Sequence, residues 1–402
     1  MNQTTSKLWT KDFIVVSSIN FFLTLIFYLL MVTIAVFAVD EYSASTSEAG
    51  LVTGIFIIGA LIGRLLIGRL IVTFSRKKIL YTGLILFTLT TAFYFFEFGL
   101  GFLLFNRLVH GITLGMASTA TGTIVAQIIP ASRKGEGIGY YSMSATLATA
   151  IGPFIGLYLS QHASFQTIFT FCVALGFISL IIAFFLYVPP LDSSVKKSEV
   201  RGFKLSNFVE PSALPIAFIT LAAAFCYSSV LSFINFYAKD IHLVSTASFF
   251  FIVYAAAVLA SRPFTGRLMD KKGANFIMYP AFLLFGAGMF LLSTASTSFI
   301  FLLSGVLIGL GFGNMQSATQ AIAVKLTPPH RMGLATSTFF IFLDAGLGFG
   351  PYLLGFVIPV TGYSTLYVIL GVLVFASSVF YYFLHGKRES AAWAKVNASA
   401  SA

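Results

Sequence analysis

Asp344 and Arg107 lie inside long apolar runs of this 402-residue sequence, where the chemistry of an ionisable side chain is constrained. Asp344 is in the middle of the run 334–358, with no basic residue within two helical turns on either side. Desolvation disfavours the charged form of a carboxyl group in apolar surroundings, so Asp344 is expected to take up and release a proton. Arg107, in the run 100–127, is costly there unless it faces a wet cavity or a partner. It is therefore a candidate for binding a negatively charged group.

His110 follows Arg107 by about one helical turn and lies on the same side of the predicted helix. Imidazole titrates near neutral pH, although a neighbouring arginine disfavours its charged form. His110 is therefore a second candidate for proton coupling. A structural alternative stays open for all three residues: Arg107 bonded to backbone carbonyls, His110 neutral and packed, and Asp344 neutral and bonded to a neighbouring helix.

The composition indicates an integral membrane protein. Hydrophobic residues make up 58% of the chain and charged residues only 9%, whereas soluble proteins carry about 25% charged residues. Apolar runs of about 20 residues have the length of helices that cross a bilayer. An outer-membrane barrel would instead show alternating segments of about ten residues. The sequence therefore predicts an all-α membrane protein.

Twelve such runs are predicted to span the membrane, and the charges between them set their orientation. Lys and Arg fill alternate gaps, as at 76–78 and 196–204, while the intervening gaps hold acids such as Asp40 and Glu97. By the positive-inside rule, both termini are predicted to lie on the cytoplasmic side of a cell (plasma or inner) membrane. The net charge of +11 is thus explained by basic residues in the loops between spans, and it does not indicate a nucleic-acid partner. The predicted spans are 13–38, 49–71, 79–97, 100–127, 137–161, 164–187, 213–238, 247–268, 275–294, 298–322, 334–358 and 364–385.

The chain divides into two similar halves. Six spans in each half give both halves the same orientation, so a pseudo-two-fold axis along the membrane normal is expected to relate them, with the transport path between them. The expected domains are an N-terminal six-helix bundle (1–187), a cytoplasmic linker (188–212), a C-terminal six-helix bundle (213–388) and a cytoplasmic tail (389–402). A shift of 198 residues superposes ten positions, among them Arg64 on Arg262, Gly111 on Gly309, and Gly152-Pro153 on Gly350-Pro351.

Two cytoplasmic loops resemble the loop signature of the major facilitator superfamily. The first copy contains Gly68, Arg69 and Arg76. In that family the glycine permits close helix approach, and the loop's acid and basic residues latch the cytoplasmic side through charge pairs and helix ends. The first copy departs from the family pattern, because Val72 replaces the acid and Ser75 replaces a glycine. Its basic residues are also interpretable as topogenic charges alone.

The second copy, after the eighth span, is the better match. It contains Gly266, Arg267 and Asp270. Because the first copy lacks its acid, Asp270 is expected to carry the latch alone. The resemblance covers about residues 12–388 and implies two six-helix bundles around a central cavity, alternating between inward-open and outward-open states.

The fifth span carries the most specific resemblance. Its small residues are similar to the signature that marks drug:proton antiporters within the superfamily, with Ala148 in place of one glycine. A row of small residues lets another helix approach closely, and a proline permits a bend. The alternative is that any tightly packed helix pair would use such residues. The residues of this pattern are Gly139, Gly152, Pro153 and Gly156.

Polar and aromatic residues in other spans are candidates for lining a cavity. Individually they are unspecific, because the chain has 46 Phe and 17 Tyr, most of which must pack or face lipid. The candidate substrate-binding residues besides Arg107 are Asn20, Tyr28, Tyr227, Asn235, Asn314 and Gln316, with Tyr237 and Gln320 as further lining candidates.

The sequence shows no pattern typical of an enzyme. It has no Gly-rich phosphate loop and no metal-ligand spacing among its five histidines, and its two cysteines lie inside apolar runs. ATP hydrolysis in this chain is therefore excluded as an energy source. No cofactor is expected, and a proton gradient is the expected driving force. The expected partners are a small-molecule substrate, protons and the lipid bilayer, with no nucleic acid, and the protein is expected to be monomeric.

The function that these patterns favour is proton-coupled export of a small molecule by alternating access. Arg107 and His110, set against one intramembrane acid, favour an anionic or zwitterionic cargo such as a metal-chelating metabolite over a lipophilic cationic drug. One alternative is a proton symporter or facilitator that imports a nutrient, against which Gly152 and Pro153 argue. Another is a receptor or scaffold without turnover, against which the costly Arg107 and Asp344 argue.

Overall fold

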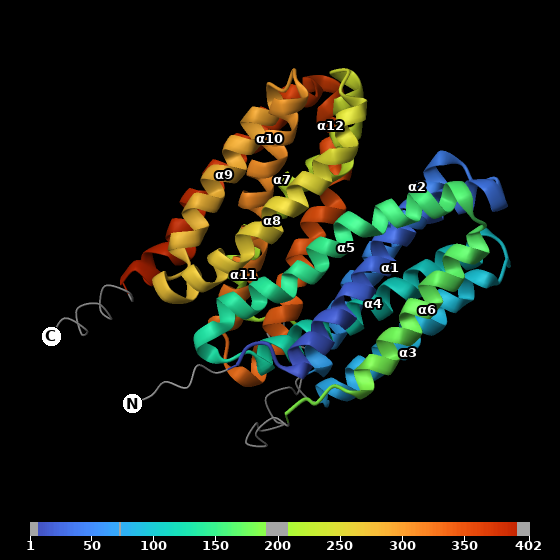
Figure 1. Ribbon diagram of the computed structural model, residues 1–402, viewed down its shortest axis with the longest axis horizontal. Coiled ribbons are helices and arrows are strands. Elements are labelled where there is room, and N and C mark those ends of the chain that lie inside the picture. The colour runs from blue at the N-terminus through green and yellow to red at the C-terminus, as the bar shows by residue number, and fades with distance from the viewer. Residues whose placement is uncertain (1–6, 72–73, 190–207, 392–402) are drawn as a thin grey trace. The chain divides into compact units, whose positions relative to one another are not determined.

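The described part of the chain is helical (Figure 1). The structure is a computed structural model that describes residues 7–71, 74–189 and 208–391. Within these ranges there is no β-strand, and eleven helices are long and apolar enough to cross a membrane. The prediction of an all-α chain is therefore confirmed for these residues. Val72 and the stretch 190–207 of the predicted linker lie outside the described residues.

By their contacts the helices form two units, and each unit includes a short segment from the other half of the sequence. As a result α5 (Lys134–His162) and α12 (Met332–Tyr381) are each divided between the units. Shifting 131–143 by the 198-residue repeat offset gives 329–341, so the two exchanged segments are near-equivalents in the repeat. The first unit comprises Met1–Pro130, Ser144–Glu210 and Thr327–Ile341, and the second comprises Ala131–Met143, Pro211–Leu326 and Phe342–Ala402.

The helices that lie wholly in the first unit are α1 (Lys11–Tyr42), α2 (Thr46–Leu70), α3 (Arg76–Ala92) with the 3₁₀ turn η1 (Phe93–Phe95), α4 (Leu100–Ile128) and α6 (Phe165–Phe184). Helix α4 packs against α1, α2 and α3, while α6 packs against α1 and α3. The approach of α2 to α4 requires glycine, because a Cβ atom at Gly111 would lie 2.0 Å from the carbonyl oxygen of Phe56.

The helices of the second unit are α7 (Leu214–Asp240), α8 (Val244–Lys272), α9 (Asn275–Ser293), and α10 (Ser298–Ile308) continued through the π-helical turn η6 (Gly309–Gly313) into α11 (Asn314–Lys325). Helix α8 packs against α10 and η6. A Cβ atom at Gly309 would lie 2.6 Å from the carbonyl oxygen of Tyr254. These residues stand 198 positions after Gly111 and Phe56, so the sequence repeat is also a repeat of helix packing.

The eleventh and twelfth predicted spans are joined in α12. Its 50 residues keep helical dihedral angles except at Gly362, where φ is 72° and ψ is 173°. A positive φ is strained for residues with a Cβ atom and favours glycine. Helix α12 therefore consists of two helical segments that meet at Gly362. The structure describes eleven helices of membrane-spanning length, and α12, which holds two predicted spans, is counted among them as one helix. The count of twelve spans therefore stays a prediction.

Candidate functional site

Arg107 is completely buried on α4, in the first unit. Its Nε donates a hydrogen bond to the backbone carbonyl of Val52 at 3.0 Å, and Nη1 donates to the hydroxyl of Tyr94 at 3.3 Å. The guanidinium carbon lies 4.3 Å from the centre of the Phe56 ring, within cation–π range. Neutral groups of α2 and η1 thus supply the contacts of this buried cation.

His110 belongs to the same cluster. Its Nδ1 lies 2.9 Å from the Tyr94 hydroxyl and its Nε2 lies 3.1 Å from the Thr91 hydroxyl. The Thr91 hydroxyl donates its own proton to the carbonyl of Phe87, so it accepts from Nε2–H, and Nδ1 is left to accept from the Tyr94 hydroxyl. This pattern favours a neutral His110, and its role in proton coupling stays a prediction.

Asp344 lies in the second unit, on a part of α12 that packs against α7. The side chain is half-buried. Two residues later, a Cβ atom at Gly346 would lie 2.7 Å from the carbonyl oxygen of Leu221 on α7. Asp344 is therefore positioned by a close helix pair. The structure brings Arg107 and His110 together in one unit and places the predicted coupling acid in the other.

The Asp270 carboxylate, in the last turn of α8, lies against the first turn of α5 within the second unit. Oδ1 accepts a hydrogen bond from the N–H of Gly135 and Oδ2 accepts one from the N–H of Glu136, each at 2.8 Å. Lys325, the last residue of α11, donates to Oδ1 at 2.7 Å. A carboxylate is stabilised at a helix N-terminus by the free amides and by the helix dipole. Asp270 thus joins α5, α8 and α11.

Glu136 provides a second acid at the same place. Its two carboxylate oxygens accept hydrogen bonds from Nε of Arg133 and Nε of Arg267, each at 2.7 Å. The backbones also touch, since a Cβ atom at Gly266 would lie 2.7 Å from Cα of Glu136. Gly266, Arg267 and Asp270 therefore all contact the start of α5. We call this group the latch cluster: Arg133, Glu136, Arg267, Asp270 and Lys325.

Sequence reasoning did not single out Tyr94 or Glu136. Tyr94 is one of many aromatic residues near the ends of spans, and nothing in the sequence distinguishes it from the others. Glu136 could have been noticed in the sequence, because it is an acidic residue in a basic loop, two residues after Lys134. Its partner Arg267 is 131 residues away in the sequence, so no local sequence pattern predicts that the two residues pair.

The first copy of the loop signature lies in the first unit, beside the start of α12. A Cβ atom at Gly68 would lie 2.6 Å from Oγ of Ser337. Arg76 is buried and donates hydrogen bonds to the side-chain carbonyl of Gln127 and, at 3.4 Å, to the carbonyl of Pro329. The side chain of Arg69 lies outside what the structure describes.

The small residues of α5 face α1. A Cβ atom at Gly152 would lie 2.8 Å from Cβ of Tyr28, and one at Gly156 would lie 2.8 Å from the carbonyl oxygen of Leu29. Pro153 is inside the helix between them. Gly139 is buried in the part of α5 that belongs to the second unit. Gly152 and Gly156 therefore allow α1 to pack closely against α5.

The polar candidates are spread over both units. In the first unit Asn20 donates a hydrogen bond to Ser144 at 2.8 Å, which ties α1 to α5. In the second unit the Asn314 side chain accepts from Thr265 at 2.9 Å and donates to the carbonyl of Leu310 at 2.8 Å. These contacts make Asn20 and Asn314 bridges between helices.

The aromatic and remaining amide candidates have different surroundings. Tyr227 is buried and stacks on Phe312, with ring centres 4.1 Å apart. Gln316 is half-buried, whereas Asn235 is exposed. None of these positions tests a substrate-binding role, which stays a prediction for each of them.

The sequence matches the family model described as Major Facilitator Superfamily over residues 16–298 and 216–400. This chain belongs to the Major Facilitator Superfamily. The crystal structure of the superfamily transporter FucP in the outward conformation has the same fold, with a TM-score of 0.77 at 15% identity, covering 94% of this chain and 99% of that one. The protein is therefore a multi-pass membrane transporter.

Curated relatives include both uncharacterized and named members of the superfamily. An uncharacterized MFS-type transporter of Methanocaldococcus jannaschii is 28% identical over 81% of this chain and 85% of its own. The staphylopine export protein of Staphylococcus aureus is 21% identical over 83% of this chain and 86% of its own. Multidrug resistance protein 2 of Bacillus subtilis is 25% identical over 77% of this chain and 80% of its own.

Proposed function

We propose that this transporter exports a small molecule, a drug or a metabolite, in exchange for protons and by alternating access. The observation that carries the proposal is the construction of α5. Its glycine row, which resembles the antiporter signature, packs against α1, and its first turn is held by Asp270 and Arg267. The names of two relatives, an export protein and a multidrug resistance protein, support export over import.

Asp344 is the proposed proton-coupling residue. Its half-buried position on α12 supports this role, because a carboxyl group that changes its exposure to water between two states also changes its affinity for protons. A proton gradient then favours one state over the other by the difference between those affinities. We further propose that both termini and the predicted linker 188–212 face the cytoplasm of a cell membrane.

Arg107 supports an anionic or zwitterionic cargo, such as a metal-chelating compound. It is completely buried, and its contacts are with neutral groups, so no acidic side chain among the described residues compensates its charge. If it binds the cargo, Arg107→Ala will weaken substrate binding more than Arg107→Lys, which retains a positive charge. Unchanged binding by Arg107→Ala would remove the argument for an anionic cargo and make a cationic drug the better candidate.

The proposal is tested by proton flux in proteoliposomes. Vesicles with an acidic interior are given cationic drugs, sugars or chelators from outside, and internal pH and substrate uptake are recorded together. Antiport predicts that uptake of the true substrate is accompanied by alkalinisation of the interior. Substrate and protons moving in the same direction would indicate a symporter, and substrate movement insensitive to the gradient would indicate a facilitator. Either result would contradict proton-coupled export.

A further inference from the structure

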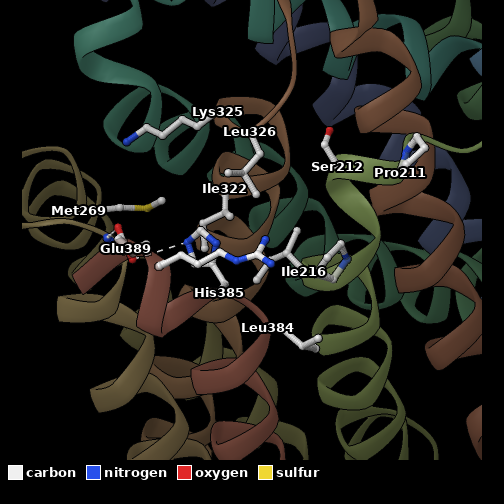
Figure 2. A pocket seen from close by; sticks show the side chains of 13 residues that line it. Pro211, Ser212, Ile216, Met269, Ile322, Lys325, Leu326, Leu384, His385 and Glu389 are labelled. Carbon is white, nitrogen blue, oxygen red and sulfur yellow. Dashed lines mark hydrogen bonds and ion pairs between the residues drawn. The ribbon is translucent and has the colours of Figure 1, made fainter. Parts of the chain in front are cut away.

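A cavity of about 500 Å³ lies at one end of the second unit, where α7 begins and α11 ends (Figure 2). The segment after α12, which includes the turn η8 (Tyr382–Gly386), lines another part of its wall. Apolar side chains make up most of the lining, among them Ile216, Ile322, Leu326 and Leu384. This volume falls within the range of small-molecule sites, which are typically apolar with a few polar groups.

Basic residues exceed acidic ones in the lining of this cavity. Lys325, His385 and Arg388 face a single acid, Glu389. Glu389 is already engaged, because its carboxylate accepts a hydrogen bond from the N–H of Asn275 at 3.0 Å and lies 3.6 Å from Nε2 of His385. Arg388 makes no ion pair or hydrogen bond with the residues that the structure describes. The cavity therefore offers an uncompensated cation beside an apolar wall.

Lys325 connects this cavity to the latch cluster. Its ammonium group lies 2.7 Å from Oδ1 of Asp270, and the side chain also lines the cavity. The Lys325 side chain is 34% exposed, whereas that of Asp270 is 8% exposed. Lys325 is thus the accessible partner of the pair, and an anion in the cavity would compete with Asp270 for it.

We propose that this cavity binds an amphipathic anion, a carboxylate or phosphate on a short apolar body, and that binding competes with Asp270 for Lys325. The apolar wall accommodates the body of such a molecule, while Arg388 and Lys325 attract its charged end. A soluble metabolite has this chemistry as a whole molecule, and an anionic lipid has it at its headgroup end. The site would regulate the latch, and the proposal does not depend on the identity of the transported cargo.

Protection of an introduced thiol tests occupancy. Ser212 lines the cavity, and the native Cys172 and Cys226 are buried, so a Ser212→Cys variant is labelled selectively. The full-length protein is placed in phosphatidylcholine nanodiscs and labelled with N-ethylmaleimide. We expect 4-phenylbutyrate to slow the labelling and its neutral analogue, 4-phenylbutanamide, to leave it unchanged. Ala131→Cys, at an exposed position that does not line the cavity, is the accessibility control.

Charge variants in the same background test the mechanism. Arg388→Gln should weaken the affinity for 4-phenylbutyrate by about tenfold or more, as expected for a lost charge-assisted hydrogen bond. Lys387→Gln removes a neighbouring exposed charge outside the lining and should leave the affinity unchanged. Asp270→Asn frees Lys325 and should tighten binding by up to about fivefold. A misfolded variant would not gain affinity, so this gain separates competition from structural damage.

Nanodiscs that contain phosphatidylglycerol distinguish the two sources of the anion. If a lipid occupies the cavity, anionic nanodiscs will protect the Ser212→Cys thiol without added probe, and Arg388→Gln will abolish the protection. If the ligand is soluble, only 4-phenylbutyrate will protect. Both results support the site. Labelling that neither the lipid nor the probe slows would overturn the proposal, as would equal effects of Lys387→Gln and Arg388→Gln on affinity.

Discussion

The carboxylate of Asp270 accepts a hydrogen bond from the backbone N–H of Glu136 at 2.8 Å. The Glu136 carboxylate in turn accepts a hydrogen bond from Arg267, three residues before Asp270 in α8, at 2.7 Å. One turn of α8 therefore supplies both the Asp270 carboxylate, which binds the backbone at the start of α5, and Arg267, which binds the Glu136 carboxylate there. Such reciprocal contacts fix the two helix ends more firmly than either pair would alone.

Removing the charge of Asp270 should weaken the latch cluster. Asp270→Asn keeps the size of the side chain but loses the ion pair with Lys325 and the charge that two amides stabilise. We expect the latched state to lose about tenfold in population, because a charge-assisted hydrogen bond contributes about 1.5–3 kcal/mol. Initial transport rates in proteoliposomes should fall. Asp240→Asn, at an exposed carboxylate, is the control, and normal transport by Asp270→Asn would contradict a latch role.

Neutralising Glu136 should destabilise the protein more than neutralising its partner Arg267. The Glu136 side chain is 5% exposed and Arg267 is 57% exposed. Glu136→Gln leaves two arginines without their carboxylate, which should lower the free energy of unfolding by about 1–3 kcal/mol. Arg267→Gln breaks one exposed contact and should lower it by at most about 1 kcal/mol. Thermal unfolding in detergent measures both, and the opposite order of the two variants would contradict this account.

The sequence predicted the helices and only part of the latch cluster. Apolar runs are long and separated by charges, so the positions of the helices follow from burial in a bilayer. Asp270 was predicted because its loop resembles a known signature. The groups that donate hydrogen bonds to Asp270 could not be predicted, because they are the backbone amides of Gly135 and Glu136, and every residue except proline has such an amide. The same reason hid the carbonyl of Val52 that binds Arg107.

Adding a methyl group at Gly152 should disturb the contact between α5 and α1. A Cβ atom there would lie 2.8 Å from Cβ of Tyr28, so Gly152→Ala should destabilise the protein by about 1–3 kcal/mol. Gly54 provides a matched control, because a Cβ atom at that position of α2 would meet nothing within 4 Å. Gly54→Ala should stabilise the helix by up to about 1 kcal/mol. Equal melting temperatures of the two variants would show that the glycine row has no packing role.

The predicted topology is tested by labelling introduced cysteines in intact cells. Ser194 lies in the predicted cytoplasmic linker, and Asp240 ends α7 in a gap predicted to be outside. The native Cys172 and Cys226 are buried and give a low background. A membrane-impermeant maleimide should label Asp240→Cys in intact cells and Ser194→Cys only after the membrane is permeabilised. Labelling of Ser194→Cys from outside would reverse the predicted orientation.

The measurement that tests proton-coupled export most directly compares accumulation and binding in Asp344→Asn. The amide keeps the shape of the side chain but does not titrate, so the variant should bind substrate without being driven by a proton gradient. In proteoliposomes with an imposed gradient, we expect substrate binding to be retained, with no dependence on pH across the carboxyl's own titration range. We expect gradient-driven accumulation to be lost. Uphill accumulation by Asp344→Asn at the wild-type rate would show that Asp344 is structural and would contradict the account.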